Sequence, residues 1–402
     1  VDIAGFTSKP GFGSIDKKVG QRSKEDISRY DISSNFELGK FFPEKVNLRI
    51  PMYLGISESK MNPEYNPLDP DVPLKSALAH AETKTEKDSI LYYAQDYTRR
   101  KSLNFTNVGV GRVTKKPRVY DPGNLSLNYS FSEIYSRNVK TEINVERTYR
   151  GGFSYIYNAQ PKNIAPLKQM KILRSPLFRL IRDFNFYPMP KHISVRMDLD
   201  RYYNEVKTRN VTNPFLRIRP TFRKDFLWNR YYDIKYDITR SLRFDFSANN
   251  MARIDEPEGG VDKERYKDQY ESWKDSVLYN IKTMGRNLRY NHTINTTYTI
   301  PINKIPLLNW VTASVRYNAR YEWMVGPVYP DSLNIHLGNT IQNYNTAQVN
   351  SQLNMTNLYN KWGLLRKINQ NNARRMSGNK APPKMKKVTY EREGLRLAAG
   401  QP

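Results

Sequence analysis

The 402-residue sequence has no cysteine and no long apolar run, and each absence excludes a class of structure. Without cysteine, neither disulfide bonds nor zinc sites with thiolate ligands can form. No segment approaches the roughly 18 consecutive apolar residues that a membrane-spanning helix needs, so a helical membrane protein is excluded. The sequence also begins at Val1 without a charged and then apolar leader, and we therefore expect a piece of a longer protein.

Apolar residues are scarce as a whole, whereas aromatic residues are abundant. The hydrophobic fraction of 38% is low for a protein that buries a conventional core, and 29 tyrosines make up most of the aromatic fraction of 12%. This combination favours a protein that is wet on one side and meets an interface on the other. The length suits two or three ordinary domains, or one large β structure.

Basic residues outnumber acidic ones by 65 to 39, which gives a formal net charge of +26. Such a charge makes nucleic acid or an anionic membrane surface the first partner to consider. About a third of the excess lies between residues 361 and 396, and the rest is spread along segments that also contain acidic residues. A nucleic-acid groove would more often concentrate its charge on one element, so nucleic-acid binding is the weaker interpretation.

Polar and apolar residues alternate in about eleven segments, as in strands whose two faces meet different environments. In one segment, Val311 and Val315 alternate with Arg316 and Arg320. Several segments exceed ten residues, whereas strands of soluble proteins usually have about five or six and a tilted membrane-spanning strand needs about nine to eleven. The segments are residues 30–39, 46–57, 103–113, 124–135, 146–158, 192–206, 222–238, 241–253, 287–301, 310–324 and 346–360.

The connections between these segments are sorted by length. Those at residues 41–45, 239–240 and 302–309 are short, whereas those at 58–101, 254–286 and 325–345 are long. Short turns on one side and long loops on the other are typical of outer-membrane barrels, and a soluble sandwich has no reason for this sorting. A long connection at residues 159–191 on the short-turn side is the exception.

The sequence therefore predicts an all-β fold, the wall of a transmembrane antiparallel β-barrel, with helical insertions in its loops. We expect residues 1–360 to form an arc of a giant outer-membrane barrel, with residues 159–191 as a basic inner insertion and residues 361–402 as a basic tail. About eleven strands are unlikely to close by themselves, because bacterial outer-membrane barrels have even strand counts. Aromatic and aliphatic residues should face lipid, and charged and amide residues should face water.

This arrangement gives two sets of candidate residues, one for each face. The candidates for a water-filled lumen are Arg196, Asp198, Asp233, Arg243, Asp245, Arg316 and Arg320. The candidates for aromatic residues at the membrane interface are Tyr203, Trp228, Tyr232, Tyr321 and Trp323.

Two connections contain helical patterns. Residues 262–284 place Tyr266, Tyr270 and Trp273 at helical spacing, with Asp262 as a plausible N-cap. We expect this outer-loop helix to fold over the mouth of its own barrel, and docking of an external partner is the alternative. Residues 174–184 have an apolar and a basic side, which suits the membrane surface or the base of the barrel.

Motifs for catalysis are absent from the sequence. The four histidines stand alone, and there is neither a GxSxG motif nor a phosphate-binding loop. Alternating aspartates and arginines need no catalytic explanation, since opposite charges on neighbouring strands form cross-strand ion pairs. We therefore expect no enzyme, no catalytic residues, no cofactor and no metal.

Two stretches resemble one known family. The stretch FFPEKVNLRIPMYLGISESKMNPEYNPLDPDVPL at 41–74 and the stretch IRDFNFYPMPKHISVRMDLDRYYNEVKTRN at 181–210 resemble the SprA/Sov-type translocon of the type IX secretion system of Bacteroidota. The two stretches are far apart and in the expected order. The chain is thus similar to an internal fragment of that family.

The resemblance implies a very large single-chain barrel in the outer membrane that exports folded proteins, among them gliding adhesins. It also implies three kinds of partner besides the lipid bilayer: cargo with a C-terminal signal domain, a PorV-like partner barrel and a periplasmic plug protein. An inner-membrane motor would supply energy, so no nucleotide site is expected, and no nucleic-acid partner is implied. Another outer-membrane channel or transporter, a soluble basic β protein that binds nucleic acid, and a hydrolase remain as alternatives in that order.

Overall fold

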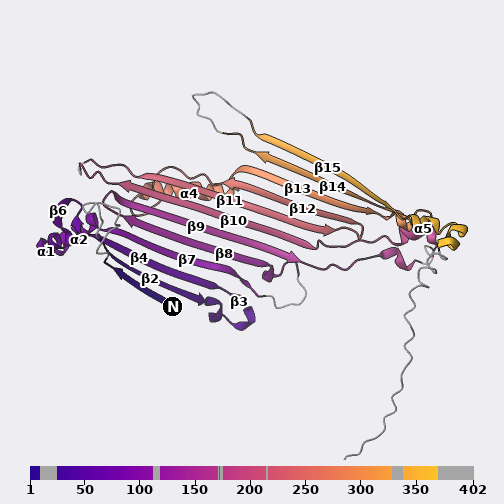
Figure 1. Ribbon diagram of the computed structural model, residues 1–402, viewed down its shortest axis with the longest axis horizontal. Helices are drawn as coiled ribbons and strands as arrows, with labels where there is room; N and C mark the ends of the chain where they lie inside the picture. Colours follow the sequence, from indigo (N-terminus) through magenta and orange to yellow (C-terminus); the bar gives the residue numbers. More distant parts are fainter. Residues whose placement is uncertain are drawn as a thin grey trace, which may run out of the picture.

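The computed structural model describes residues 1–9, 25–111, 118–170, 172, 175–213, 216–327 and 338–369. Their main feature is one antiparallel sheet of 13 strands. Figure 1 shows the strands side by side in one broad layer. The prediction of an all-β fold is therefore confirmed.

Twelve strands follow one another across the sheet, and each pairs with its neighbours in the sequence of strands. They are β1 (Asp2–Ser8), β2 (Glu25–Glu37), β4 (Pro51–Pro63), β7 (Asp96–Val110), β8 (Leu125–Arg137), β9 (Thr141–Asn158), β10 (His192–Thr208), β11 (Thr221–Asp237), β12 (Leu242–Arg253), β13 (Arg286–Ile300), β14 (Val311–Met324) and β15 (Thr340–Leu353). The short strand β3 (Leu48–Arg49) also pairs with β7, and β5 (Tyr65–Asn66) pairs with β6 (Asp69–Pro73) outside the main sheet. The strand count was underestimated, because β1 lies outside the predicted segments.

Consecutive strands are antiparallel, so their connections leave the sheet at two opposite ends. We call these the long-loop end and the short-turn end. The long-loop end carries α1 (Leu74–His80), α2 (Lys84–Ala94) and α4 (Lys267–Lys282), at the left of Figure 1. The short-turn end carries α3 (Arg179–Arg182), α5 (Met355–Tyr359) and the 3-10 helices η2 (Leu38–Phe41), η3 (Glu44–Val46), η4 (Pro122–Asn124), η5 (Pro166–Gln169), η7 (Pro176–Phe178) and η8 (Pro301–Lys304).

The expected long connections share one end of the sheet, but their bounds differ from the prediction. The first covers residues 64–95, because β4 continues to Pro63 and β7 begins at Asp96. The last lies between β14 and β15 and includes residues 328–337, which are outside the described residues. At this end the observed strands are therefore longer than the segments in which polar and apolar residues alternate most clearly.

The helix expected at residues 174–184 is much shorter in the structure. Only η7 and the four-residue α3 form there, and Arg174 lies outside the described residues. Pro176 explains part of the difference, because proline suits the first turn of a helix and not its interior. Most of the basic tail, residues 370–402, also lies outside the described residues.

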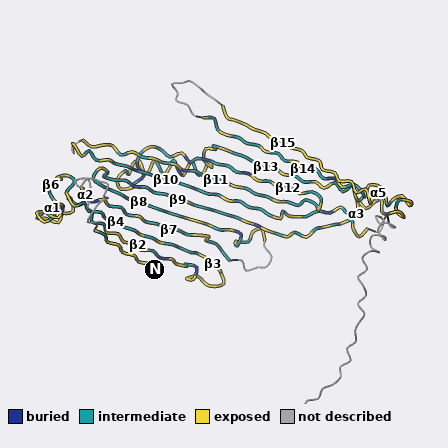
Figure 2. Tube along the Cα trace, viewed as in Figure 1, coloured by how far each residue is buried: buried dark blue, intermediate teal, exposed yellow. Residues whose placement is uncertain are grey.

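Little of either face of the sheet is covered by a packed hydrophobic core. Figure 2 shows mostly intermediate and exposed residues along the strands. A cluster of buried side chains, Phe226, Trp228, Ile254 and Val277, lies where α4 packs on β11. No helix in the described part of the chain is both long and apolar enough to cross a membrane.

Candidate functional site: the two faces of the sheet

Cross-strand register places all seven lumen candidates on one face of the sheet. Directly paired residues share a face, and Ser194, two residues before Arg196 in β10, pairs with Asp233 in β11. Asp233 in turn pairs with Ser247 of β12, whose alternate positions include Asp245 and Arg243. Through β13, the same face continues to Arg316 and Arg320 of β14. Asp198, two residues after Arg196 in β10, has the same parity and lies on this face as well. We call this the polar face.

Ion pairs and uncharged polar groups make up the polar face. Arg196 and Asp198 approach to 2.6 Å within β10, and Arg150 of β9 lies 3.4 Å from Asp200 of β10. Arg289 of β13 pairs with Glu322 of β14. The predicted cross-strand ion pairs are therefore present, and the surface between them consists mainly of serine, threonine, asparagine and glutamine side chains.

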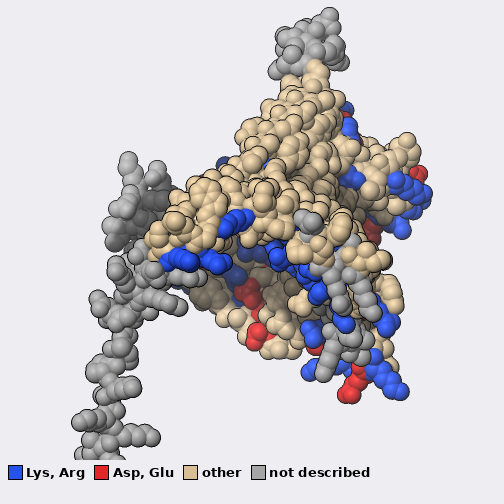
Figure 3. Space-filling view, turned by 90° about the vertical axis from the view of Figure 1, so that its right-hand side faces the viewer, with Lys and Arg blue, Asp and Glu red and all other residues tan. Residues whose placement is uncertain are grey.

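A recess of about 1070 Å³ lies in the polar face over β7 to β11. Gly152 contributes no side chain there, and its pairing partners are Asn128 and Asp198. Figure 3 views the molecule from the short-turn end and shows acidic side chains set among more numerous basic ones. Within the described residues, no group of three or more histidine, aspartate or glutamate side chains is placed to hold a metal ion.

The opposite face carries exposed apolar side chains, and we call it the apolar face. Phe246 of β12 pairs with Ile234 of β11 and Ile294 of β13, and the same parity holds across the sheet. Contiguous exposed apolar surface of this extent marks contact with lipid or protein. Its exposed members include Ile32, Leu54, Ile56, Leu125, Leu127, Tyr298, Tyr317, Val349 and Leu353.

The apolar positions form a band whose border runs diagonally across the strands. Counted from the long-loop end, the band begins at Ile56 on β4, and the pairing row of Ile56 reaches Lys224 on β11. The band begins at Ile294 on β13, which lies in the row of Ile234, ten residues beyond Lys224. The border therefore moves by about ten residues over the seven steps from β4 to β13.

This displacement gives the angle between the strands and the border. With about 3.4 Å per residue and about 4.8 Å between strands, the strands are tilted by roughly 45° from the perpendicular to the border. On β14 every second side chain from Val311 to Ala319 is apolar or aromatic, and these residues span roughly 20 Å at this tilt. Tyr321 and Trp323 follow directly above them, as aromatic residues flank the roughly 25 Å apolar band of membrane barrels.

The aromatic candidates separate into two groups. Tyr232, Tyr321 and Trp323 lie on the apolar face, and the ring of Tyr321 stacks on His292 with 5.2 Å between ring centroids. Tyr203 is 0% exposed and Trp228 is 8% exposed, so they are not surface aromatics and that interpretation was wrong. Both lie on the part of the apolar face that the connection containing α4 covers.

The α4 connection packs on the apolar face, beyond the band at the long-loop end, with Trp273 and Ile281 against the cluster around Trp228. The helix α4 ends at Lys282, the left-handed residue after its cap is Met284 with a φ of +67°, and the N–H of the next residue, Gly285, donates to the Asn280 carbonyl. The structure thus places the helix on one face of the sheet, whereas we had expected it across an opening.

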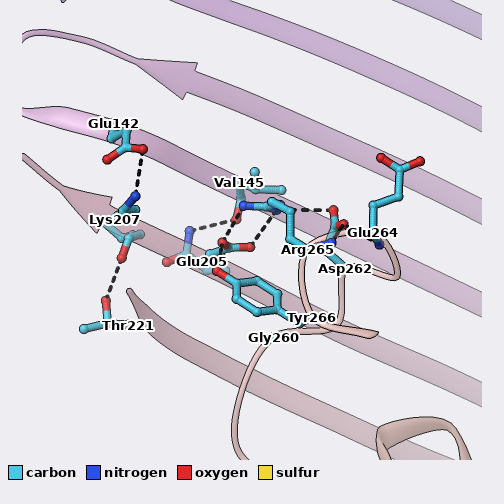
Figure 4. Close-up of polar contacts among 12 residues, drawn as sticks. Glu142, Val145, Glu205, Lys207, Thr221, Gly260, Asp262, Glu264, Arg265 and Tyr266 are labelled. Atoms are coloured by element: carbon cyan, nitrogen blue, oxygen red, sulfur yellow. Dashed lines mark hydrogen bonds and ion pairs between the residues drawn. The ribbon is translucent and has the colours of Figure 1, made fainter. Parts of the chain in front are cut away.

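Buried ion pairs fix this connection. Glu205 is fully buried and accepts hydrogen bonds from Arg265, from Tyr266 Oη at 3.0 Å and from Tyr203 Oη at 3.0 Å. Figure 4 shows Arg265 and Tyr266 pointing toward Glu205. Burial, together with the charge of Glu205, raises the pKa of Tyr266. The expected helix residues Tyr266 and Trp273 therefore serve local packing.

A second buried pair lies beside the first. Arg201 donates from Nε and Nη2 to the two oxygens of Glu256 at 2.7 and 2.8 Å, and Trp273 Nε1 donates to Glu256 at 2.6 Å. Tyr270, the third expected helix residue, stacks near Trp273 at 5.6 Å between ring centroids. Sequence reasoning missed Glu205 and Glu256, because neither the parity of Glu205 on its strand nor the position of Glu256 in a loop distinguishes it from other acidic residues.

A family model, SprA_N, described as a motility related/secretion protein, matches residues 1–78. The matched residues include the first three main strands and the whole of the first resembling stretch, 41–74. No curated protein matches the chain. The predicted resemblance to the SprA type is thus confirmed over this part of the chain.

Proposed function

We propose that this chain forms part of the wall of a protein-conducting channel in the outer membrane, which exports folded proteins in type IX secretion. The diagonal border of the apolar band carries the proposal. A sheet packed on a protein core has no reason to cut its apolar surface at a constant angle to the strands, whereas a bilayer imposes a plane. The tilt of roughly 45° and the height of roughly 20 Å between the aromatic residues and the short-turn end both suit that plane.

The polar face supports transport of folded cargo. A passing folded domain would adhere to exposed apolar patches, and the polar face instead offers hydroxyl, amide and mutually paired charged groups. Arg196, Arg243, Arg316 and Arg320 would contact the cargo. Their positive charge would act only over about 8 Å, because salt screens it. On this proposal the chain is a wall and not an enzyme.

The match to a motility related/secretion family supports the choice of protein export over other channel functions. The proposal includes cargo with a C-terminal signal domain, a PorV-like partner barrel, a periplasmic plug and the lipid bilayer as partners. It includes neither nucleic acid nor a cofactor.

Site-specific photocrosslinking in cells tests the proposal. A crosslinker at Asp245 on the polar face should capture a secreted protein whose export has been stalled. The same crosslinker at Phe246, the next residue of β12, should capture lipid instead, since Phe246 faces the other way. Cargo captured at Phe246, or at neither position while export is stalled, would contradict a conducting role for the polar face.

A further inference from the structure

Basic side chains gather beyond the apolar band in one sector of the apolar face. On β4, β7, β8 and β9, alternation brings Lys60, Arg99, Lys101, Arg137 and Arg147 to this face at the long-loop end. We call these five residues the basic border. Tyr30, Tyr97 and Tyr135 lie among them on the same face.

The basic border has more positive charge than its own acidic partners neutralise. Glu58 pairs with Lys60 at 2.8 Å, and Glu133 pairs with Arg147 at 2.8 Å and with Arg99 at 3.7 Å. Two carboxylates on this part of the face therefore stand against five cations.

Two of the five cations, Lys101 and Arg99, keep donor groups that the acidic residues of this face do not occupy. Lys101 has no ion pair among the described residues, and Arg99 Nε is buried there without a hydrogen-bond acceptor. Leu103, the next residue of β7 on this face, is already part of the apolar band. The border thus joins the band directly, without an intervening neutral layer.

Three other strands are uncharged at the same height, where the residues above the band are Asn250 of β12, Tyr290 and His292 of β13, and Tyr321 and Trp323 of β14. On β10 and β11 the cations Arg201 and Arg230 lie at this height, but both are buried. The accessible positive charge is therefore a property of one sector and not of the whole apolar face.

We propose that the basic border binds the phosphate groups of lipids whose acyl chains lie on the apolar band. This inference rests on the proposed membrane location of the band. Phosphate matches the chemistry, because guanidinium and ammonium groups donate charge-assisted hydrogen bonds to phosphate oxygens. The tyrosines add amphipathic rings, which prefer the depth of the headgroups. A lipid engages border and band together, which a soluble anion cannot do.

The test uses the intact protein in detergent, stripped of lipid, and measures bound lipid by native mass spectrometry. Phosphatidic acid is the probe, and diacylglycerol with the same acyl chains lacks only the phosphate. We expect phosphatidic acid to bind at least about tenfold more tightly than diacylglycerol, since each basic residue near a membrane surface contributes roughly a factor of five. Equal binding of the two lipids would overturn the inference.

Matched variants locate the effect. The triple variant Lys60→Gln, Arg99→Gln, Lys101→Gln should lose at least about tenfold in affinity for phosphatidic acid. The control is Arg243→Gln, Arg316→Gln, Arg320→Gln, which removes the same charge from the polar face and should bind as wild type. Equal losses in both triple variants would show a net-charge effect and no site.

A single-residue variant and a competition experiment complete the test. If the triple variant does not fold, Lys101→Gln alone should weaken binding and Lys101→Arg should restore it. Excess inorganic phosphate should not displace the lipid, and displacement would identify a site for free anions instead. Phosphate-dependent lipid binding without cargo crosslinking at Asp245 would retain this inference while contradicting the channel.

Discussion

Arg265 and Glu205 are 60 residues apart in the sequence, yet Arg265 Nη1 and Nη2 donate to Glu205 Oε1 and Oε2 at 2.7 and 3.0 Å. Glu205 has 0% exposure, whereas the Arg265 side chain is 34% exposed. The pair therefore fixes a connection to a strand that is otherwise distant. Because one partner is fully desolvated, the pair cannot be broken without leaving a buried charge.

Arg265→Ala should release the α4 connection from the sheet. Loss of one partner of a buried pair costs about 3–5 kcal/mol, and the partial exposure of Arg265 lowers the expected cost to about 2–3 kcal/mol. Hydrogen exchange in residues 267–282 should accelerate accordingly. Lys274→Ala is the control, since its 3.9 Å pair with Glu271 is exposed. Unchanged exchange in the Arg265 variant would contradict the role of the pair.

Tyr92→Leu should loosen the connection between β4 and β7. Arg137 and Arg209 both lie over the Tyr92 ring, with guanidinium carbons 4.7 and 4.6 Å from the ring centroid. Loss of two cation–π contacts should cost about 1–2 kcal/mol. Limited proteolysis should then cleave residues 64–95 faster, whereas the exposed substitution Lys87→Ala should leave the rate as in wild type.

Phe246→Arg and Ser247→Arg test the two faces with the same new side chain. Phe246 lies at the edge of the apolar band, where an arginine should cost up to about 1 kcal/mol if the band contacts lipid. Ser247 lies on the polar face, where arginine is already common. We expect reduced assembly into membranes for Phe246→Arg only. Equal assembly of both variants would argue against lipid on the apolar face.

Acid should loosen the α4 connection before it affects the strands. A hydrogen bond from Arg286 lowers the pKa of Asp255, and bonds and charge from Arg265 lower the pKa of Asp262 although burial opposes them. A lowered pKa in the folded state gives stability that is present above the unfolded value near 3.9 and lost as pH falls through the folded value. The protection of the α4 amides, which is their exchange relative to the intrinsic rate at each pH, should therefore fall as the pH falls below about 4.

A substitution separates this effect from general acid unfolding. Asp255→Asn keeps a similar shape but removes the titrating group, so the acid-induced loss of protection in α4 should be smaller than in wild type. The polar-face variant Asp245→Asn serves as its control, and its α4 exchange should follow the wild-type pH dependence. An Asp255→Asn variant with the full acid response would rule out Asp255 as a contributor.

The sequence predicts the faces of the sheet well because alternation is a local property. The segment predicted at 192–206 became β10, and the parity of Arg196 and Asp198 set their face without further information. The strand β1 was missed because seven residues with only Ile3 and Phe6 as large apolar members give a weak pattern. Its pairing with β2 supplies the hydrogen bonds that define it.

Long-range packing explains why Tyr203 and Trp228 were assigned wrongly. Their parity correctly places them on the apolar face, but a connection some fifty residues later in the chain covers them. Nothing in a strand's own sequence indicates which surface a later helix will choose. The angle of the band likewise requires the register of several strands together, since each strand alone gives only the position at which its own alternation begins.

The position of α4 also determines the free cross-section of the lumen in the proposed channel. A connection of thirty-two residues, 254–285, folded to the polar face would narrow the conduit and add a movable obstruction. On the apolar face the same connection thickens the wall outward and leaves the cross-section free. In this arc, passage of a bulky folded domain would then need no displacement of α4, and the helix would act as an external stiffening rib.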